Sequence, residues 1–217
     1  MLEADEAAAF RGVGRLNVAG TRFCTATLIS ETVIITAAHC LFNPRSHERV
    51  PIGEFRFVAG LRLGRTAAVR RAARAVTHPD FAFNIPTPAD VGTDMALIEL
   101  DRPVPAEDAA AFETAALGGA PLAIVSYARD RAQAPSIQEP CGLATTFAAV
   151  AALDCAVTYG ASGAPVFESA GEDRRLVAVV SAMGNALSTG REVTLTVLVA
   201  GWIEPLLTEL AAAPRED

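Results

Sequence analysis

The sequence predicts an all-β fold in which two β units pack together and a C-terminal helix closes the molecule. Ten short runs of β-branched or apolar residues are separated by Gly, Pro, Asn and Asp at close intervals, which is typical of barrels or a sandwich. A polar, proline-rich stretch over 101–108 lies near the middle of the chain. The last apolar segment has helical spacing instead of strand alternation.

The elements follow in order along the chain. The first unit has expected strands at 14–18, 25–29, 32–37, 55–59, 67–71 and 96–100, and the second at 122–127, 165–167, 176–182 and 192–199. The boundary falls within 101–108, so the expected domains are 1–105 and 106–217. The alanine-rich segment after residue 108 has the composition of a helix, and a closing helix is expected near 201–211, packed on a barrel.

Composition excludes several classes of function. All 18 Lys+Arg residues are arginine, so chemistries that need a lysine amine are excluded: Schiff bases, pyridoxal-phosphate anchors, serine–lysine dyads and Walker-type phosphate loops. A net charge of −7 and an aromatic content of 6% disfavour nucleic-acid partners. The longest apolar run, 147–153, is far shorter than the roughly 18 to 20 residues of a membrane helix, so no membrane insertion is expected.

The cysteines form an even set. Cys24 and Cys40 lie close in sequence, as do Cys141 and Cys155, which predicts two local disulfides. Each is worth about 3 kcal/mol in the chain-entropy picture and favours an oxidising compartment. Four free thiols in a cytosolic protein are the alternative; a zinc site is weaker, because no cysteine or histidine pair has ligand spacing. The acidic start of the chain lacks the features of a signal peptide, so either none exists or it has been removed. Because two disulfides favour an oxidising compartment, we expect a secreted or periplasmic protein whose signal peptide has been removed.

Three segments contain residues suited to nucleophilic catalysis. His39 follows an apolar strand and small residues, Asp94 precedes an apolar strand, and Ser162 lies in a turn bracketed by glycines. Each alone has an ordinary structural interpretation: a core-edge histidine, a capping aspartate, a turn serine. In the order His, Asp, Ser they point to a hydroxyl nucleophile with its general base and the carboxylate that orients the base. Asp80 and Asp90 are weaker candidates, since no apolar strand directly follows either.

At these residues the chain resembles the chymotrypsin-like serine peptidases. Their T-A-A-H-C motif is complete at 36–40, and their G-D-S-G-G-P motif has a counterpart, G-A-S-G-A-P, at 160–165. The approach Leu153-Asp154-Cys155 is similar to that of the bacterial branch, which includes the glutamyl endopeptidases. The resemblance spans about 14–210. It implies two six-stranded antiparallel β-barrels and a monomeric serine endopeptidase that cuts polypeptides through an acyl-enzyme, without cofactor or metal.

The resemblance also implies roles for particular residues. His39, Asp94 and Ser162 would form the catalytic triad, with Ser181 donating a further hydrogen bond to Asp94. The backbone amides of Gly160 and Ser162 would form the oxyanion hole, and the Cys24–Cys40 disulfide would lie behind the histidine. The expected substrate-binding residues are Ala156, Val157, Tyr159, Ser181, Ala182, Met183 and Gly184.

Four positions depart from the family pattern. Ala161 replaces the aspartate that pairs with a new N-terminus in the animal enzymes, so activation by that ion pair is not expected. The expected pocket base has no aspartate, and Val180 stands where glutamyl endopeptidases have a histidine; both Arg/Lys and Glu preferences are therefore disfavoured. With Met183 narrowing the pocket, we expect cleavage after small or medium apolar residues. A protease-like binding module and an esterase remain the alternatives.

Overall fold

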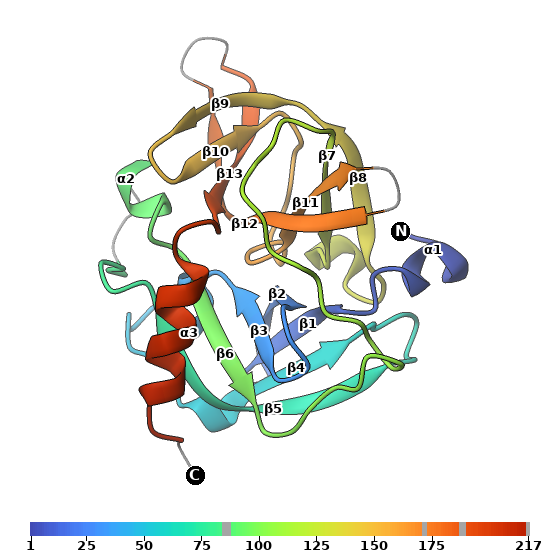
Figure 1. The fold of residues 1–217 in the computed structure, drawn as a ribbon, viewed down its shortest axis with the longest axis vertical. Helices are drawn as coiled ribbons and strands as arrows, with labels where there is room; N and C mark the ends of the chain where they lie inside the picture. The colour runs from blue at the N-terminus through green and yellow to red at the C-terminus, as the bar shows by residue number, and fades with distance from the viewer. Residues whose placement is uncertain (84–87, 171–172, 187–189, 216–217) are drawn as a thin grey trace.

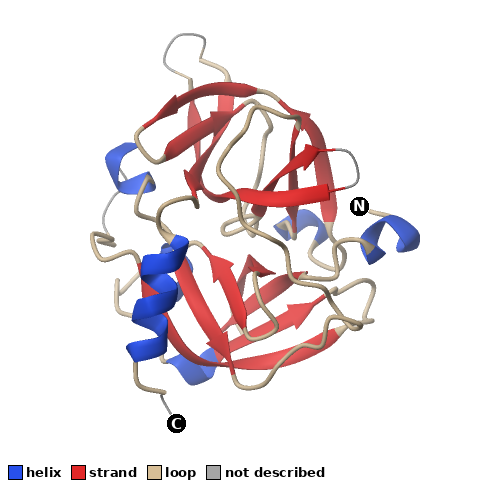
Figure 2. Ribbon diagram, viewed as in Figure 1, coloured by secondary structure: helices blue, strands red, loops and turns tan. Residues whose placement is uncertain are grey.

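The computed structural model describes residues 1–83, 88–170, 173–186 and 190–215. Its strands form a closed six-stranded barrel and a seven-stranded sheet, which lie next to each other in Figures 1 and 2. The predicted all-β class is confirmed. The helices of the described residues are α1 (Ala4–Ala8), α2 (Pro88–Val91) and α3 (Ile203–Ala212), with 3-10 turns η1 (Ala38–Leu41), η2 (Ile52–Glu54) and η3 (Arg129–Arg131). No helix among these residues is long and apolar enough to cross a membrane.

The barrel contains the first six strands in the order β1-β2-β3-β6-β5-β4, all paired antiparallel. They are β1 (Val13–Val18), β2 (Arg22–Leu28), β3 (Val33–Thr36), β4 (Phe55–Ala59), β5 (Ala68–Thr77) and β6 (Ala96–Leu100). All six strands predicted for this part of the chain are present, and β5 continues beyond its predicted end. Leu16, Ile34, Phe57 and Ile98 are fully buried among the side chains of the barrel core.

The second sheet has the order β8-β7-β11-β12-β13-β10-β9. Its strands are β7 (Leu122–Ser126), β8 (Ser136–Cys141), β9 (Leu143–Phe147), β10 (Val150–Leu153), β11 (Pro165–Ala170), β12 (Asp173–Asn185) and β13 (Glu192–Leu198). The sequence predicted four of these strands and missed β8, β9 and β10. The resemblance implied a second six-stranded barrel, whereas the structure has a seven-stranded sheet, in which the chain bends at Gly142 so that β8 pairs with β7 and β9 with β10. A Cβ at Gly142 would lie 2.4 Å from the Asp154 carboxylate. Because β8 and β9 are the two edge strands of the sheet, the bend between them connects its opposite edges.

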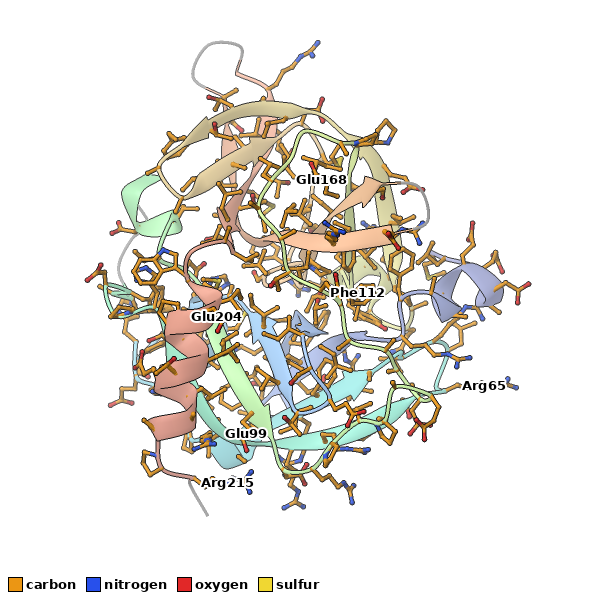
Figure 3. The ribbon with its side chains drawn as sticks, in the orientation of Figure 1. Arg65, Glu99, Phe112, Glu168, Glu204 and Arg215 are labelled. Atoms are coloured by element: carbon orange, nitrogen blue, oxygen red, sulfur yellow. A yellow bond between two sulfur atoms is a disulfide. The ribbon has the colours of Figure 1, made fainter. Side chains whose placement is uncertain are left out.

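The alanine-rich segment between the barrel and the second sheet is not a helix, and the prediction of one there is wrong. The Phe112 N–H donates to the Leu28 carbonyl at 2.9 Å, and the Ala115 N–H donates to that of Leu176 at 3.0 Å. These bonds to both β units satisfy the backbone in an extended form, which overrides the helix propensity of alanine. The Phe112 ring lies 4.5 Å from that of Phe167, between the two units (Figure 3).

Both ends of the chain pack on the unit at the other end of the sequence. Helix α3, close to its predicted position, packs along β5 and β6 of the barrel (Figure 1), where Arg74 donates to the carbonyls of Ala211 and Ala213. At the other end, the Leu2 N–H donates to the Pro135 carbonyl at 2.8 Å. The Phe10 ring packs 5.8 Å from Phe167 in β11.

Candidate active site

His39 lies on η1, directly after β3. Every residue of β3 is buried, and Ala37 and Ala38 are fully buried after it, so their small side chains leave room for the imidazole. Cys40 forms a disulfide with Cys24 of β2, which ties η1 to the barrel. The second predicted disulfide, Cys141–Cys155, is also present.

Asp94 connects three parts of the site. Its Oδ1 accepts the backbone N–H of His39 at 2.8 Å, and its Oδ2 lies 2.7 Å from His39 Nδ1. Oδ2 also accepts the Ser181 hydroxyl at 2.5 Å, the hydrogen bond that the resemblance implied. Asp94 comes two residues before β6, which pairs with β3, so the barrel register brings the carboxylate to the histidine. It is only 5% exposed.

A β-bulge in β12 aims Ser181 at Asp94. Val180 pairs with Thr196 and Ala182 pairs with Leu195, so Ser181 is the extra residue between two consecutive partners. Bulges of this kind redirect one side chain and are common next to active sites. The bulge lets a strand of the second sheet donate a hydrogen bond to a carboxylate of the barrel.

The electrostatics of the pair depend on burial and mutual charge. Burial by itself lowers the pKa of His39, but the charge and hydrogen bond of Asp94 outweigh it, so that pKa lies above its ordinary value. Arg22 acts in the opposite direction by repelling the protonated imidazole. Burial by itself raises the pKa of Asp94, yet His39 and Ser181 hold it below its ordinary value. The charged carboxylate is therefore maintained inside the protein.

Ser162 lies in a turn with two glycines of positive φ, Gly160 at +96° and Gly163 at +76°. A Cβ on Gly160 would lie 2.5 Å from the Phe23 ring, and one on Gly163 would lie 2.4 Å from the Thr25 carbonyl. Both positions therefore require glycine for conformation and for space. The Thr25 N–H donates to the Ser162 carbonyl at 2.9 Å, so β2 of the barrel fixes the turn.

Two amides of this turn are available to a ligand. Among the residues that the structure describes, the N–H groups of Gly160 and Ser162 donate to no protein acceptor, whereas the Ala161 N–H between them donates to the Thr158 carbonyl at 3.1 Å. The Gly160 carbonyl is held by the Thr25 hydroxyl at 3.0 Å. A fixed peptide with free amides on either side of a serine suits the binding of an oxyanion.

A cavity of about 660 Å³ brings these residues together. Its wall includes His39, Gly160 and Ser162, and five of the expected substrate-binding residues: Val157, Tyr159, Ser181, Ala182 and Met183. Ala156 and Gly184 are not part of the described wall; Ala156 is exposed, and Gly184 lies beside Leu195. Tyr159 and Met183 are exposed at its rim.

Three side chains support the site, and only one of them, Thr36, belongs to a motif that the sequence analysis identified. Arg22 lines the cavity and donates a hydrogen bond to the Cys40 carbonyl at 2.9 Å and another to the Phe42 carbonyl. The fully buried Thr25 holds the serine turn to the barrel through its bonds to the carbonyls of Gly160 and Ser162. The fully buried Thr36 supports Thr25, since its hydroxyl donates to the Thr25 carbonyl at 2.8 Å. The signal for Thr36 was the T-A-A-H-C motif, and the signal for Thr25 was a polar residue in a largely apolar strand. The sequence offered no signal for Arg22.

A second, smaller cavity of about 240 Å³ also borders His39. The side chains of Phe81, Val91 and Ala182 make much of its wall apolar. It is a second place where an apolar group could lie beside the imidazole.

One cluster has the elements of a metal site but not its chemistry. Ligand atoms of Cys24, His39 and Cys40 lie within 4.8 Å of one another. The two sulfurs are joined as a disulfide, so neither is a thiolate that could bind a metal ion.

The barrel, the second sheet and the cavity they share define a chymotrypsin-like fold. The family model described as a trypsin-like peptidase domain matches residues 24–179, which is more than half of the chain. The protein therefore belongs to the trypsin-like peptidases and is a serine endopeptidase, a hydrolase that acts on polypeptides.

Two solved structures are similar to this chain. One is a thermostable serine protease, AL20, from an extremophilic microorganism, with a TM-score of 0.75 and 16% sequence identity over 95% of this chain and 100% of that one. The other is a Glu endopeptidase in complex with MPD, with a TM-score of 0.76 and 16% identity over 97% and 96% of the two chains. At this identity the likeness establishes the shared fold.

Proposed function

We propose that His39, Asp94 and Ser162 form the catalytic triad of this peptidase. The observation that carries the proposal is the Asp94 carboxylate on His39 Nδ1 at 2.7 Å, with Ser162 in the wall of the same cavity as the imidazole. An aspartate on Nδ1 fixes the tautomer in which Nε2 can accept a proton. The raised pKa of His39 also suits a group that must hold a proton during the reaction.

The reaction then follows from the roles of these groups. Ser162 Oγ attacks the carbonyl carbon of the scissile peptide as His39 Nε2 takes its proton. The C–N bond of the tetrahedral intermediate breaks when His39 gives that proton to the leaving nitrogen. Water, activated by His39 in turn, hydrolyses the acyl-enzyme and restores the Ser162 hydroxyl.

Gly160 and Ser162 supply the amides for the oxyanion. Their N–H groups lack protein acceptors among the described residues, and the Thr25 hydroxyl fixes the peptide between them by donating to the carbonyl of Gly160. Loss of one donor of such a pair costs about 2.7–4 kcal/mol of transition-state stabilisation. Ala161 leaves no carboxylate to pair with an amino terminus, so we propose that this turn needs no such ion pair.

The cavity wall supports cleavage after small or medium apolar residues. Val157, Val180 and Ala182 present apolar surface, and Met183 narrows the rim. The described wall contains no carboxylate that could receive Arg or Lys. A cleavage profile on a peptide library should show Ala, Val or Leu before the cut; a profile dominated by Arg, Lys or Glu would contradict this preference.

Labelling with a fluorophosphonate tests the triad. The wild type should be labelled at Ser162, the Ser162→Ala variant should not, and Ser46→Ala, an exposed serine outside the cavity, should behave as the wild type. If a folded wild type is not labelled, the protein is better described as a protease-like binding module. Parallel rates on ester and peptide substrates would identify an esterase.

We also propose the setting in which the enzyme works. Two disulfides fit an oxidising compartment, so we propose a secreted or periplasmic protein that acts as a monomer. We propose domains 1–105 and 106–217, since β1 to β6 form the barrel and β7 to β13 the second sheet. Size-exclusion chromatography with light scattering would test the monomer.

A further inference from the structure

Arg22 is a cation in the cavity wall that has no carboxylate partner in the part of the chain that the structure describes. It is half-buried, and burial lowers the pKa of its guanidinium, although arginine keeps its charge at any ordinary pH. One of its nitrogens is held by the carbonyls of Cys40 and Phe42. Among the described residues, no ion pair of Arg22 is found, so its remaining N–H groups are available to a ligand.

The cavity as a whole has an unbalanced charge. The described wall contains two arginines, Arg22 and Arg129, and no aspartate or glutamate. Arg129 is exposed at the wall, whereas Arg22 is anchored to the backbone beside the disulfide. A half-buried, preorganised guanidinium binds a carboxylate more strongly than a freely solvated one, because less side-chain entropy is lost.

The position of Arg22 indicates which part of a substrate it meets. His39 Nε2, the atom that must protonate the leaving nitrogen, lies 3.9 Å from Cys40 Sγ. Arg22 donates to the carbonyl of that same Cys40. The acyl side of the substrate is expected along Val157 and the bulged segment of β12, which line the cavity from the second sheet, whereas Arg22 lines it from β2 of the barrel. The residues released with the leaving amine therefore lie beside the disulfide and Arg22.

We propose that Arg22 is a specificity-determining residue that binds a carboxylate on the leaving-group side of the scissile bond, in the first or second residue after it. The inference rests on the proposed catalytic role of Ser162 and extends it from the acyl pocket to the other half of the substrate. The carboxylate can belong to an Asp or Glu side chain or to the C-terminus of a short leaving peptide.

Matched peptides test the proposal. The acyl side is kept constant and Glu is compared with Gln at the first, second and third leaving-side positions; a separate pair ends after two leaving-side residues with a free carboxylate or an amide. The wild type should prefer Glu, or the free carboxylate, about tenfold in kcat/KM at the first or second position, with a smaller preference at high salt. The ratio for two peptides does not depend on how much of a variant is folded.

Variants assign that preference to Arg22. Arg22→Gln should bring the ratio to about one, and Arg22→Lys should retain part of it. Arg56→Gln is the matched control, because Arg56 also donates to a backbone carbonyl, that of Phe55, but lies outside the cavity wall. If Arg22→Gln kept the preference for the carboxylate peptide, the carboxylate site would lie elsewhere. If only Arg129→Gln lost that preference, the site would be assigned to Arg129.

Fluorophosphonate labelling of Ser162 in the same samples separates the two proposals. A labelled wild type that cleaves peptides without any preference for a leaving-side carboxylate would refute the role of Arg22 and leave the triad intact. A folded wild type that is neither labelled nor active would refute the triad, and the Arg22 proposal with it.

Discussion

Asp94 accepts three hydrogen bonds, from the His39 backbone, the His39 ring and the Ser181 hydroxyl. Asp94→Asn places an amide where Nδ1–H needs an acceptor, which permits the wrong tautomer of His39. We expect kcat to fall by about 10⁴-fold while fluorophosphonate labelling slows and folding is retained. Steady-state kinetics with a thermal melt would check this. Activity within tenfold of the wild type would show that another group orients the histidine.

Arg22 also affects the base through its charge. The repulsion between Arg22 and the protonated imidazole lowers the pKa of His39 against the larger effect of Asp94. Arg22→Gln removes the repulsion, so the pKa of His39 should rise further and the acid limb of the kcat/KM profile should move to higher pH. The pH–rate profile of Arg56→Gln should match that of the wild type. If the acid limb of the Arg22→Gln profile moved to lower pH instead, Arg22 would not be lowering the pKa of His39.

Gly163 is the residue of the serine turn with the least room. A Cβ there would lie 2.1 Å from the Thr36 hydroxyl and 2.4 Å from the Thr25 carbonyl, at a φ of +76°. Gly163→Ala should therefore cost about 3 kcal/mol of unfolding free energy and lower kcat by displacing Ser162. Gly53→Ala, at an open site without positive φ, is the control and should leave both unchanged. Denaturant titration and kinetics measure the two effects.

Motif residues could be predicted from the sequence, and the resemblance also supplied Ser181 and the Cys24–Cys40 disulfide, but Arg22 could not be predicted. His39, Asp94 and Ser162 stand in short segments whose local pattern is informative, and the structure brings His39 and Asp94 into contact. Arg22 is the first residue of β2 and has no pattern around it, and its position depends on hydrogen bonds to the carbonyls of Cys40 and Phe42, which are tertiary contacts. Sequence order cannot reveal which carbonyls an arginine will meet.

The apolar strands β3 and β6 were predicted, but β10, which is also apolar and buried, was missed because a run of only four residues cannot be told from a buried helical segment by its pattern. Strand β9 was missed because all five of its residues are exposed, which leaves no buried face to produce a pattern. Helix propensity gave the wrong prediction for the segment after residue 108, because hydrogen bonds to the carbonyls of Leu28 and Leu176 hold that segment in an extended form. The bulge at Ser181 is a register effect between β12 and β13, and register is not encoded in either strand alone.

The end of α3 depends on a carboxylate in β6. Glu99 pairs with Arg74 and Arg215 near the C-terminal end of α3 (Figure 3), and Arg74 also donates to two carbonyls there. Burial by itself raises the pKa of Glu99, but the two guanidinium groups hold it below its ordinary value of 4.5. The charged form therefore stabilises the fold at neutral pH, and this contribution is lost as the pH falls through the lowered pKa.

Glu99→Gln should reduce the unfolding free energy at neutral pH by about 1–2 kcal/mol. The difference from the wild type should shrink as the pH is lowered below about 4.5, where the wild-type carboxylate also becomes protonated. Denaturant titrations over that pH range measure the difference in unfolding free energy, and hydrogen exchange in α3 shows whether the helix end is affected. A difference that grows on acidification would mean that the charge of Glu99 is not stabilising.

At the scale of the whole molecule, the contacts between the barrel and the second sheet predict a single unfolding transition. The Thr25 and Ser162 backbones are hydrogen-bonded across the two units, and Asp94 and Ser181 are joined in the same way. Calorimetry should give one transition whose calorimetric and van't Hoff enthalpies agree. Leu206→Ala, which removes a fully buried side chain of α3, should lower the Tm of that one transition. Two resolved transitions would mean that the units unfold separately.

Each end of the chain packs on the unit formed by the other half of the sequence, so the two units should stay together when the chain between them is cut. The N-terminal segment lies on the second sheet through Leu2 and Phe10, while α3 lies on the barrel. Each half of the sequence therefore has a terminal segment that packs on the other half. A protein nicked once between residues 101 and 121 should travel as one particle on a sizing column, and two separately expressed fragments should reassemble into an enzyme.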